Sequence, residues 1–298
     1  VRSDHMKLTS DAIQRCLPLL RQRQSAESDC DPTVESSEGT GPMTKAAFDS
    51  GYFGLARPEI LERVPGSARR ILDVGCGAGR LGASLKARQD CVVWGVELNK
   101  AAAARARTVL DRVIEGNAEL VTDALRGETF DAIVCGDILE HLREPLDFLR
   151  QARQWLNPAG QLIASIPNVR HRSVVAALIA GNWTYEAAGL LDQDHVRFFT
   201  RREIEKLIFR AGMSLESIEM IPEPGFEQWD QAGRPETVEL GGLTLSGLSE
   251  SDALEFHTYQ YLVTASASPP STAASQDRGL IQLASTYRWP DRKPMVPI

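Results

Sequence analysis

Three glycines, Gly75, Gly77 and Gly79, directly follow an apolar run at residues 71–74. Glycine lets the chain turn sharply and lets a ligand approach the backbone, because it has no Cβ atom. A turn at the carboxyl end of a strand is also where open α/β sheets bind ligands. Glu97 ends the next apolar run, where a carboxylate can hold the two hydroxyls of a ribose. The spacing therefore predicts a site for a nucleoside-derived cofactor.

Two classes of cofactor suit such a turn, and Asp73 favours one of them. A dinucleotide needs a G-x-G-x-x-G turn that offers a helix N-terminus to its pyrophosphate, and residues 77–82 satisfy that spacing. This register is late, because the turn already starts at Gly75, and in the earlier register Arg80 occupies the third glycine position. Asp73 would repel a pyrophosphate but attract the amino group and sulfonium of S-adenosylmethionine, directly or through water. A turn that only packs a helix against the sheet is the third alternative.

Short apolar runs alternate with helical segments along most of the chain. The runs have the nearly continuous apolar character of strands buried on both faces. Strands are predicted at residues 71–74, 91–97, 112–115, 130–136, 161–167, 214–221 and 259–266, and helices at 79–88, 100–111, 144–156 and 201–211. This alternation predicts βαβ units and an open parallel sheet with helices on both faces.

Five segments resemble a known family: ILDVGCGAG (71–79), VELN (96–99), FDAIVCGDILEHL (130–142), LNPAGQLIASIPN (156–168) and LLDQDHVRFFT (190–200). Together they resemble the class I S-adenosylmethionine-dependent methyltransferases, in a branch associated with sugar and polysaccharide pathways and related to ubiquinone-type methyltransferases. The first motif is shared by the whole superfamily, whereas the last is more selective. The resemblance implies an α/β, Rossmann-like, doubly wound fold with a mostly parallel seven-stranded sheet and an antiparallel last strand.

The resemblance also implies which residues bind S-adenosylmethionine. Asp73, Gly75 and Gly77 would line its methionine portion, with Cys76 contributing backbone, and Glu97 would bind the ribose hydroxyls. The remaining contacts after the strands would be Leu98, against the adenine, and Asp137 with Ile138, bordering the cofactor.

Two further assignments carry explicit alternatives. Asn117 and Ala118 stand where the family commonly has Asp before a small residue, and the Asn117 side-chain carbonyl can still accept a bond from the adenine amino group. Asp123 is the alternative acceptor for that group. Arg57 and Tyr52 would close over the carboxylate end of the cofactor, and an exposed helix position is the alternative for Arg57.

The acceptor side is expected after the fourth and fifth strands, where two histidines fall. Histidine titrates near neutral pH, so His195 or His141 can take a proton from a hydroxyl. His195 is predicted to be the catalytic base or an acceptor-positioning group, with a loop hydrogen bond as its alternative. For His141 the structural alternative, a residue at a helix start, is favoured over the catalytic one.

An insertion at residues 169–200 is predicted to form a helical cover over the acceptor pocket. Ligand sites are mostly apolar with a few polar groups, and Trp183, Tyr185 and Phe198 would supply the apolar part. Arg197 would meet a phosphate or carboxylate on the acceptor. Ordinary core packing for the aromatics and a solvated or paired guanidinium for the arginine are the alternatives.

The function that follows is methyl transfer from S-adenosylmethionine to an oxygen or nitrogen of a small metabolite. Family resemblance alone suggests a sugar or sugar nucleotide. The sequence has no compact ligand cluster such as HExxH, so no metal site is predicted. Two rival functions are a nicotinamide-dependent oxidoreductase on a similar sheet and a noncatalytic cofactor-binding scaffold that works through a partner.

Composition limits the partners and the compartment. The 33 basic and 40 acidic residues give a net charge of −7, without the basic stripe of a nucleic-acid binder. No apolar stretch approaches the roughly 20 residues that cross a bilayer, so no membrane partner is expected. Five cysteines with no CxxC pair indicate reduced, packed thiols in a cytoplasmic protein.

The sequence divides into three predicted parts. Residues 1–44 are expected to hold a cloning remnant at 1–5, a helix at 7–24 and a flexible linker rich in Ser, Glu, Asp, Gly and Pro. Residues 45–266 would form the methyltransferase domain, and residues 267–298 a flexible tail. The N-terminal helix would either pair with a second copy in a homodimer or cover the pocket.

Overall fold

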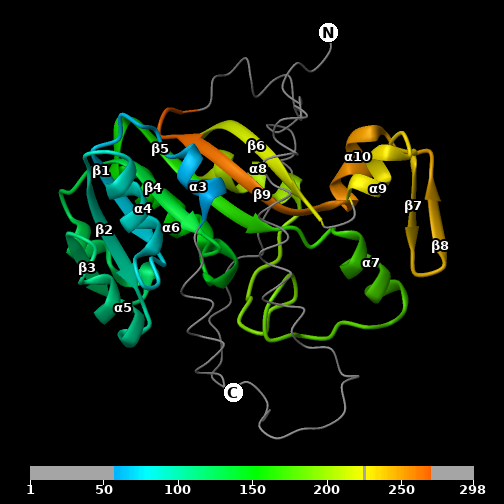
Figure 1. Cartoon of the computed structure of the whole chain (residues 1–298), viewed down its shortest axis with the longest axis horizontal. Coiled ribbons are helices and arrows are strands. Elements are labelled where there is room, and N and C mark those ends of the chain that lie inside the picture. The colour runs from blue at the N-terminus through cyan, green and yellow to red at the C-terminus, as the bar shows by residue number, and fades with distance from the viewer. Residues whose placement is uncertain (1–56, 224–225, 270–298) are drawn as a thin grey trace, which may run out of the picture.

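The computed structural model describes residues 57–223 and 226–269 of the chain (Figure 1). Its central sheet contains β1 (Arg70–Val74), β2 (Val92–Glu97), β3 (Arg112–Glu115), β4 (Phe130–Gly136), β5 (Leu156–Pro167), β6 (Ser214–Pro222) and β9 (Thr258–Ser266). The strand order is β3-β2-β1-β4-β5-β9-β6. β9 is antiparallel to β5 and β6, and the remaining pairs are parallel. This confirms the predicted seven-stranded, mostly parallel sheet with an antiparallel last strand.

Helices cover both faces of the sheet, because successive strand side chains point to opposite faces. Ile71 of β1 packs in one apolar cluster with Ile60 and Leu85, whereas Leu72 packs in a second cluster with Phe148 and Ile204. The first cluster includes residues of α3 (Pro58–Arg63), α4 (Arg80–Arg88) and α5 (Lys100–Ala106), and the second includes residues of α6 (Pro145–Trp155) and α8 (Arg201–Arg210). The two-sided burial explains the nearly continuous apolar runs of the strands.

Several boundaries differ from the sequence prediction. β5 begins at Leu156, earlier than the predicted residue 161, although residues 157–160 contain Asn, Pro and Gly, which are typical of turns. Leu156 pairs with Phe130, and the register shifts before Ala132. The helix predicted at 100–111 ends at Ala106 and continues as irregular turns.

The insertion at 169–200 is helical only over α7 (Arg172–Ile179). Residues 180–200 form an irregular loop in which Gly181 and Gly189 have positive φ, so the prediction of a helical cover is wrong for this part. Residues 226–256, for which no elements were predicted, form α9 (Phe226–Gln231), β7 (Thr237–Leu240), β8 (Leu243–Ser246) and α10 (Glu250–Phe256). The β7–β8 hairpin lies beside α7 at one end of the molecule (Figure 1).

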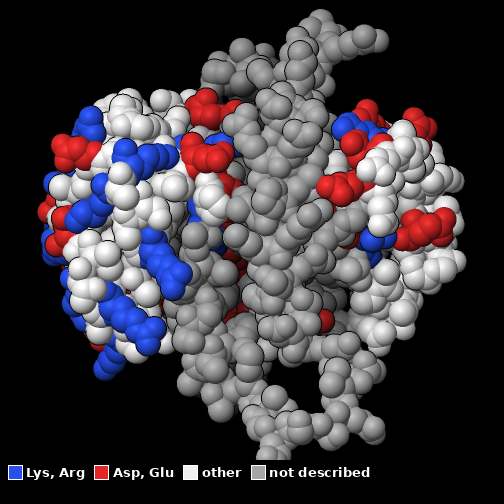
Figure 2. Space-filling model, viewed as in Figure 1, with Lys and Arg blue, Asp and Glu red and all other residues white. Residues whose placement is uncertain are grey.

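Figure 2 shows basic side chains in separate groups over the α4–α5 half and acidic ones near α9, α10 and the hairpin. Among the described residues no helix is both long and apolar enough to span a bilayer. Cys76, Cys91 and Cys135 are free thiols, and Cys16 and Cys30 lie outside the described residues. The predicted helix at 7–24, the linker, and nearly all of the predicted tail lie outside the described residues.

Candidate active site

Glu97, at the end of β2, holds the glycine turn in place. Its Oε2 accepts a hydrogen bond from the Gly77 amide at 2.8 Å, and its Oε1 accepts one from the Asn99 amide at 2.7 Å. Gly75 and Gly77 have φ of 73° and 53°, a conformation that favours glycine. A carboxylate can accept about four hydrogen bonds. Glu97 therefore keeps capacity for the two hydroxyls of a ribose in the cleft that it lines.

Asp73 brings a second carboxyl group to the same turn. It is 4 % exposed, and burial together with the charge of Glu97 raises its pKa to about 7, against the opposing effect of Arg57. The positive charge nearby is therefore insufficient to compensate the buried carboxylate fully. The turn itself leaves no room for a side chain, since a Cβ at Gly75 would lie 2.0 Å from Ile138 Cδ1.

Gly82 is the third glycine of the dinucleotide-like spacing, and the structure gives it a packing role. It does not line the cleft. A Cβ at this position would lie 2.3 Å from Leu110 Cδ2 and 3.1 Å from Val93 Cγ1. Close packing of α4 against these residues therefore accounts for the glycine without a pyrophosphate.

Arg57 is mostly buried, and the alternative of an exposed helix position is wrong. Its side chain is 12 % exposed and donates to Asp137 Oδ2 at 2.7 Å, Ser165 Oγ at 2.8 Å and Glu59 Oε1 at 2.7 Å. Burial opposes its charged form, but Asp137 and Glu59 outweigh burial and raise the pKa of Arg57. Asp137 itself has φ of 53° and also accepts from Ser165 and Gln260. This network fixes the backbone after β4, where Asp137 and Ile138 enter the cleft.

A single cleft of about 690 Å³ gathers most of the predicted cofactor residues. Asn117 lies in its lining, and its Oδ1 accepts from the Glu119 amide at 2.9 Å. Asp123, the alternative to Asn117, is not in the lining, and its side chain is 86 % exposed. Tyr52 lies outside the described residues. The predicted residues in the lining are Arg57, Asp73, Gly75, Cys76, Gly77, Glu97, Leu98, Asn117, Ala118, Asp137, Ile138 and His141.

The two predicted histidines lie together although they come from distant segments. Their ring centroids are 4.8 Å apart. His141 Nδ1 lies 3.1 Å from the Asp194 carbonyl oxygen, and His195 Nδ1 lies 3.3 Å from the Leu190 carbonyl oxygen. Burial and the neighbouring His141 lower the pKa of His195. His141 lines the cleft and His195 lies behind it, 8 % exposed.

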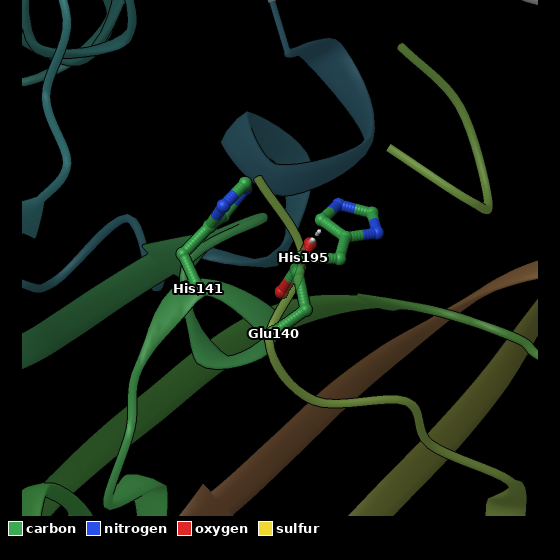
Figure 3. A group of neighbouring side chains, drawn as sticks. All are labelled: Glu140, His141 and His195. Atoms are coloured by element: carbon green, nitrogen blue, oxygen red, sulfur yellow. Dashed lines mark ion pairs between the residues drawn. The ribbon is translucent and has the colours of Figure 1, made fainter. Parts of the chain in front are cut away.

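Glu140 joins this pair and was not predicted. Its backbone carbonyl accepts from the amides of Val196 and Arg197, both at 2.9 Å, which ties η3 (Leu139–His141) to the loop before α8. Its Oε1 lies 4.0 Å from His195 Nε2 (Figure 3). Both carboxyl oxygens are buried and make no hydrogen bond within the described residues. Burial and the charge of Asp137 raise the pKa of Glu140 well above its ordinary value.

The predicted acceptor residues of the insertion do not line the cleft. Phe198 lies against Trp183 and Tyr185, with ring centroids 5.3 and 6.5 Å apart, and also against His195, at 6.3 Å. Trp183 and Tyr185 are 39 % and 51 % exposed. Arg197 donates to the backbone carbonyls of Val196 and Arg143. The acceptor-side residues that do line the cleft, and that were not predicted, are Leu142, Arg143, Asp192 and Asp194.

Comparison with known families agrees with this geometry. A family model described as "Methyltransferase domain" matches residues 9–218. The chain belongs to this methyltransferase family. It is 27 % identical to a ubiquinone biosynthesis O-methyltransferase of Cereibacter sphaeroides over 179 residues, which are 57 % of this chain and 71 % of that protein. The corresponding protein of Vibrio campbellii is 28 % identical over 166 residues, 52 % of this chain and 68 % of that protein.

A solved structure supports the same fold. The S-adenosylmethionine-dependent methyltransferase of Archaeoglobus fulgidus superposes with a TM-score of 0.50 at 16 % identity, covering 74 % of this chain and 99 % of that one. The methyltransferase described here thus has the class I, Rossmann-like fold. S-adenosylmethionine is the cofactor that the sequence resemblance implies. The cleft fits this cofactor in two ways. Gly75, Cys76 and Gly77 line the cleft, so a ligand can lie against the turn. Nearby positive charge does not fully compensate the buried carboxylate of Asp73, which therefore suits a cationic ligand.

Proposed function

We propose that this methyltransferase transfers its methyl group to a hydroxyl oxygen of a small molecule. One observation carries the proposal: the cleft that contains Asp73 and Glu97 is also lined by His141, Asp192 and Asp194. Polar groups for a hydroxyl acceptor therefore border the space that suits the cofactor. Oxygen is supported over nitrogen because the two relatives are named O-methyltransferases.

In this proposal the cofactor is held by its charges and its ribose. Asp73 attracts the positive charge of the methionine portion, and the backbone at residues 75–77 lies against it. Glu97 accepts from the ribose hydroxyls, and Leu98 and Asn117 border the adenine. Arg57 acts indirectly, because its guanidinium already donates to three side chains and holds Asp137 in the cleft wall.

S-adenosylmethionine supplies, when bound, a methyl group on a positively charged sulfur that leaves readily. The protein then has to align the acceptor hydroxyl, exclude water and provide a route for the hydroxyl proton. Ile138 and Leu142 give the cleft apolar walls near His141. We place the acceptor hydroxyl beside His141, which lines the cleft, and His195 packs against the His141 ring, so that both act as acceptor-positioning residues.

We propose only that the acceptor is a small compound with a hydroxyl group. A sugar or sugar nucleotide was the narrower expectation, but neither of the two relatives is named for one. Their names give ubiquinone biosynthesis, which supports testing catechols and phenols first.

The test is formation of S-adenosylhomocysteine by the purified full chain with three sets of acceptors: catechols and phenols, sugar nucleotides, and aryl amines of matched shape. Turnover with a hydroxyl compound is expected. The Glu97→Ala variant should bind the cofactor on the order of 100-fold more weakly, since it lacks two charge-assisted hydrogen bonds. Methylation of amines alone would overturn the oxygen assignment. Tight S-adenosylhomocysteine binding without turnover on any acceptor would favour the scaffold, and preferential dinucleotide binding would favour the oxidoreductase.

A further inference from the structure

Glu140, His141 and His195 form a group whose composition is that of a metal site. One ligand atom from each, a carboxylate oxygen and two imidazole nitrogens, can be chosen so that all lie within 4.8 Å of one another. Figure 3 shows Glu140 and His141 on η3 and His195 on the loop that runs past them. Atoms that bind one ion at about 2.1 Å lie at most about 4.2 Å apart. Side-chain rotations that move these ligand atoms by a few tenths of an ångström would therefore let all three bind one ion.

The state of Glu140 is the first independent sign of a ligand. The residue is 1 % exposed, and neither carboxyl oxygen has a hydrogen-bond partner among the described residues. Buried carboxyl groups are normally paired, hydrogen-bonded or bound to a metal, because desolvation without compensation is costly. The nearest cation-forming group, His195 Nε2, lies at 4.0 Å, beyond hydrogen-bonding distance.

The orientation of both imidazoles is the second sign. His141 Nδ1 and His195 Nδ1 each face a backbone carbonyl oxygen, which can only accept, so each Nδ1 carries the proton. In the neutral ring the lone pair is then on Nε2. Metal-binding histidines usually have this arrangement, in which the second ring nitrogen donates to a carbonyl or carboxylate that fixes the tautomer.

A second group of the same composition contains a carboxylate that is paired, although the Nε2 atoms of its two histidines, His171 and His257, have no hydrogen-bond partner among the described residues. Glu223 lies 3.0 Å from His171 Nε2 and 2.8 Å from His257 Nδ1, and it also accepts from Arg172. Its Oε1 is hydrogen-bonded and its Oε2 lies beside an imidazole, and these neighbours outweigh burial and lower the pKa of Glu223 to about 2. Glu140 has comparable histidines nearby but none of these contacts. The difference indicates that the Glu140 group is arranged for a ligand and the Glu223 group for structure.

We propose that Glu140, His141 and His195 bind one divalent transition-metal cation beside the cofactor cleft. Two nitrogen ligands and one carboxylate favour zinc, manganese, iron or cobalt over magnesium or calcium, which prefer oxygen ligands. Three protein ligands leave coordination positions for an exogenous group, as in catalytic rather than structural sites. Because His141 lines the cleft, that group is the acceptor hydroxyl. The sequence prediction of no metal site considered only compact motifs, whereas these ligands come from distant segments.

The role of the cation rests on the proposed function. A hydroxyl oxygen bound to a divalent cation loses its proton more readily. That proton passes to solvent, the oxygen forms a bond to the methyl carbon, the carbon–sulfur bond breaks, and S-adenosylhomocysteine leaves as a neutral thioether. Both histidines would then position the acceptor through the cation.

The experiment uses the full chain after treatment with a chelator and dialysis. Binding of Co²⁺ and Mn²⁺ is followed by calorimetry, by the visible absorption of Co²⁺ and by elemental analysis. We expect one ion per chain in the wild type, and an affinity on the order of 100-fold lower in Glu140→Gln and in His195→Gln. His257→Gln, which changes a buried histidine in the Glu223 group, is the matched control and should keep the wild-type affinity. Circular dichroism checks that each variant is folded.

The outcomes separate this proposal from the proposed function. A wild-type chain that binds neither ion, or a Glu140→Gln variant that binds as tightly as wild type, would overturn the metal site. An equal loss of affinity in His257→Gln would do the same. Binding of S-adenosylhomocysteine should not change when the metal is removed, whereas turnover should fall at least about 10-fold and return with the added ion. Full turnover without metal would leave the methyltransferase proposal intact and exclude the cation from the reaction.

Discussion

The carboxyl group of Asp73 places opposite demands on folding and on cofactor binding. Its pKa of about 7 lies above the value of 3.8 for an unperturbed Asp, mainly because burial disfavours the charge. The folded state therefore keeps a proton that the unfolded chain has lost at intermediate pH, and stability falls as pH rises from about 4 to about 7. A cationic ligand would reverse this penalty, since it favours the ionised carboxylate.

Replacing Asp73 should separate the two effects. Asp73→Asn is expected to unfold at higher denaturant concentration at pH 8, with a gain on the order of 4 kcal/mol that disappears near pH 4. The same variant should bind S-adenosylmethionine on the order of 10-fold more weakly, with a smaller loss for S-adenosylhomocysteine, which lacks the sulfonium charge. Denaturant titration at the two pH values and calorimetry with both compounds measure these effects. Unchanged affinity for both compounds would remove Asp73 from recognition of the cation.

At the level of single residues, the sequence predicted the cofactor side better than the acceptor side. Asp73, Gly75 and Glu97 lie at the carboxyl ends of the neighbouring strands β1 and β2, so their meeting at one edge of the sheet is a consequence of the topology. His195 lies near Glu140 only because the loop before α8 hydrogen-bonds to the Glu140 carbonyl. Glu140 belongs to the LEHL motif that the sequence analysis used. Its burial without a hydrogen-bond partner could not be predicted, because it depends on the packing of segments that are distant in the sequence.

At the level of elements, Gly82 tests how closely α4 packs against the sheet. Its backbone does not have positive φ, so the effect of a substitution is steric. Gly82→Ala is expected to destabilise the fold by about 1–3 kcal/mol, because the new Cβ would lie 2.3 Å from Leu110 Cδ2. Leu110→Val should recover part of this loss in the double variant, and cofactor affinity should stay near the wild-type value. Denaturant unfolding and calorimetry check both expectations.

Gly75→Ala is the contrasting variant in the same segment. Its φ of 73° is unfavourable for Ala, and the Cβ would lie 2.0 Å from Ile138 Cδ1 in the cleft wall. It should therefore lose cofactor binding as well as stability. If Gly82→Ala lost cofactor affinity to the same extent, α4 packing and the cofactor turn would not be separable, and the packing explanation of Gly82 would be wrong.

Periodicity predicted the central sheet because its strands are apolar on both faces, and it missed the β7–β8 hairpin. That hairpin had a signal of its own: TVEL and LTLS are separated by Gly241 and Gly242, both of which have positive φ. A Gly-Gly pair between two short strands is a typical hairpin turn. The early start of β5 was harder to predict from the sequence, since its first residues are typical of a turn and pair with β4 only through an irregular register.

For the whole molecule, Glu223 connects parts that are far apart in the chain. It follows β6, accepts from Arg172 at the start of α7, and lies 3.0 Å from His171 Nε2 and 2.8 Å from His257 Nδ1, between α10 and β9. Trp229 of α9 stacks on His257 with ring centroids 4.7 Å apart. One buried carboxylate therefore joins the insertion and the hairpin segment to the edge of the central sheet.

Protonation of Glu223 should account for part of the stability that the protein loses at acidic pH. The pKa of Glu223 is about 2 in the folded state against 4.5 for an unperturbed Glu, so the unfolded chain binds its proton first as pH falls. The stabilisation is complete above about pH 4.5 and is lost between pH 4.5 and 2. Glu223→Gln should lower the unfolding free energy at pH 7 by an amount on the order of 3 kcal/mol, and the difference from wild type should shrink across that acidic window. Glu203→Gln, in an ion pair whose glutamate is 50 % exposed, should change stability by less than about 0.5 kcal/mol at either pH. A pH-independent difference between Glu223→Gln and wild type would mean that packing, rather than the charge of this carboxylate, holds the junction together.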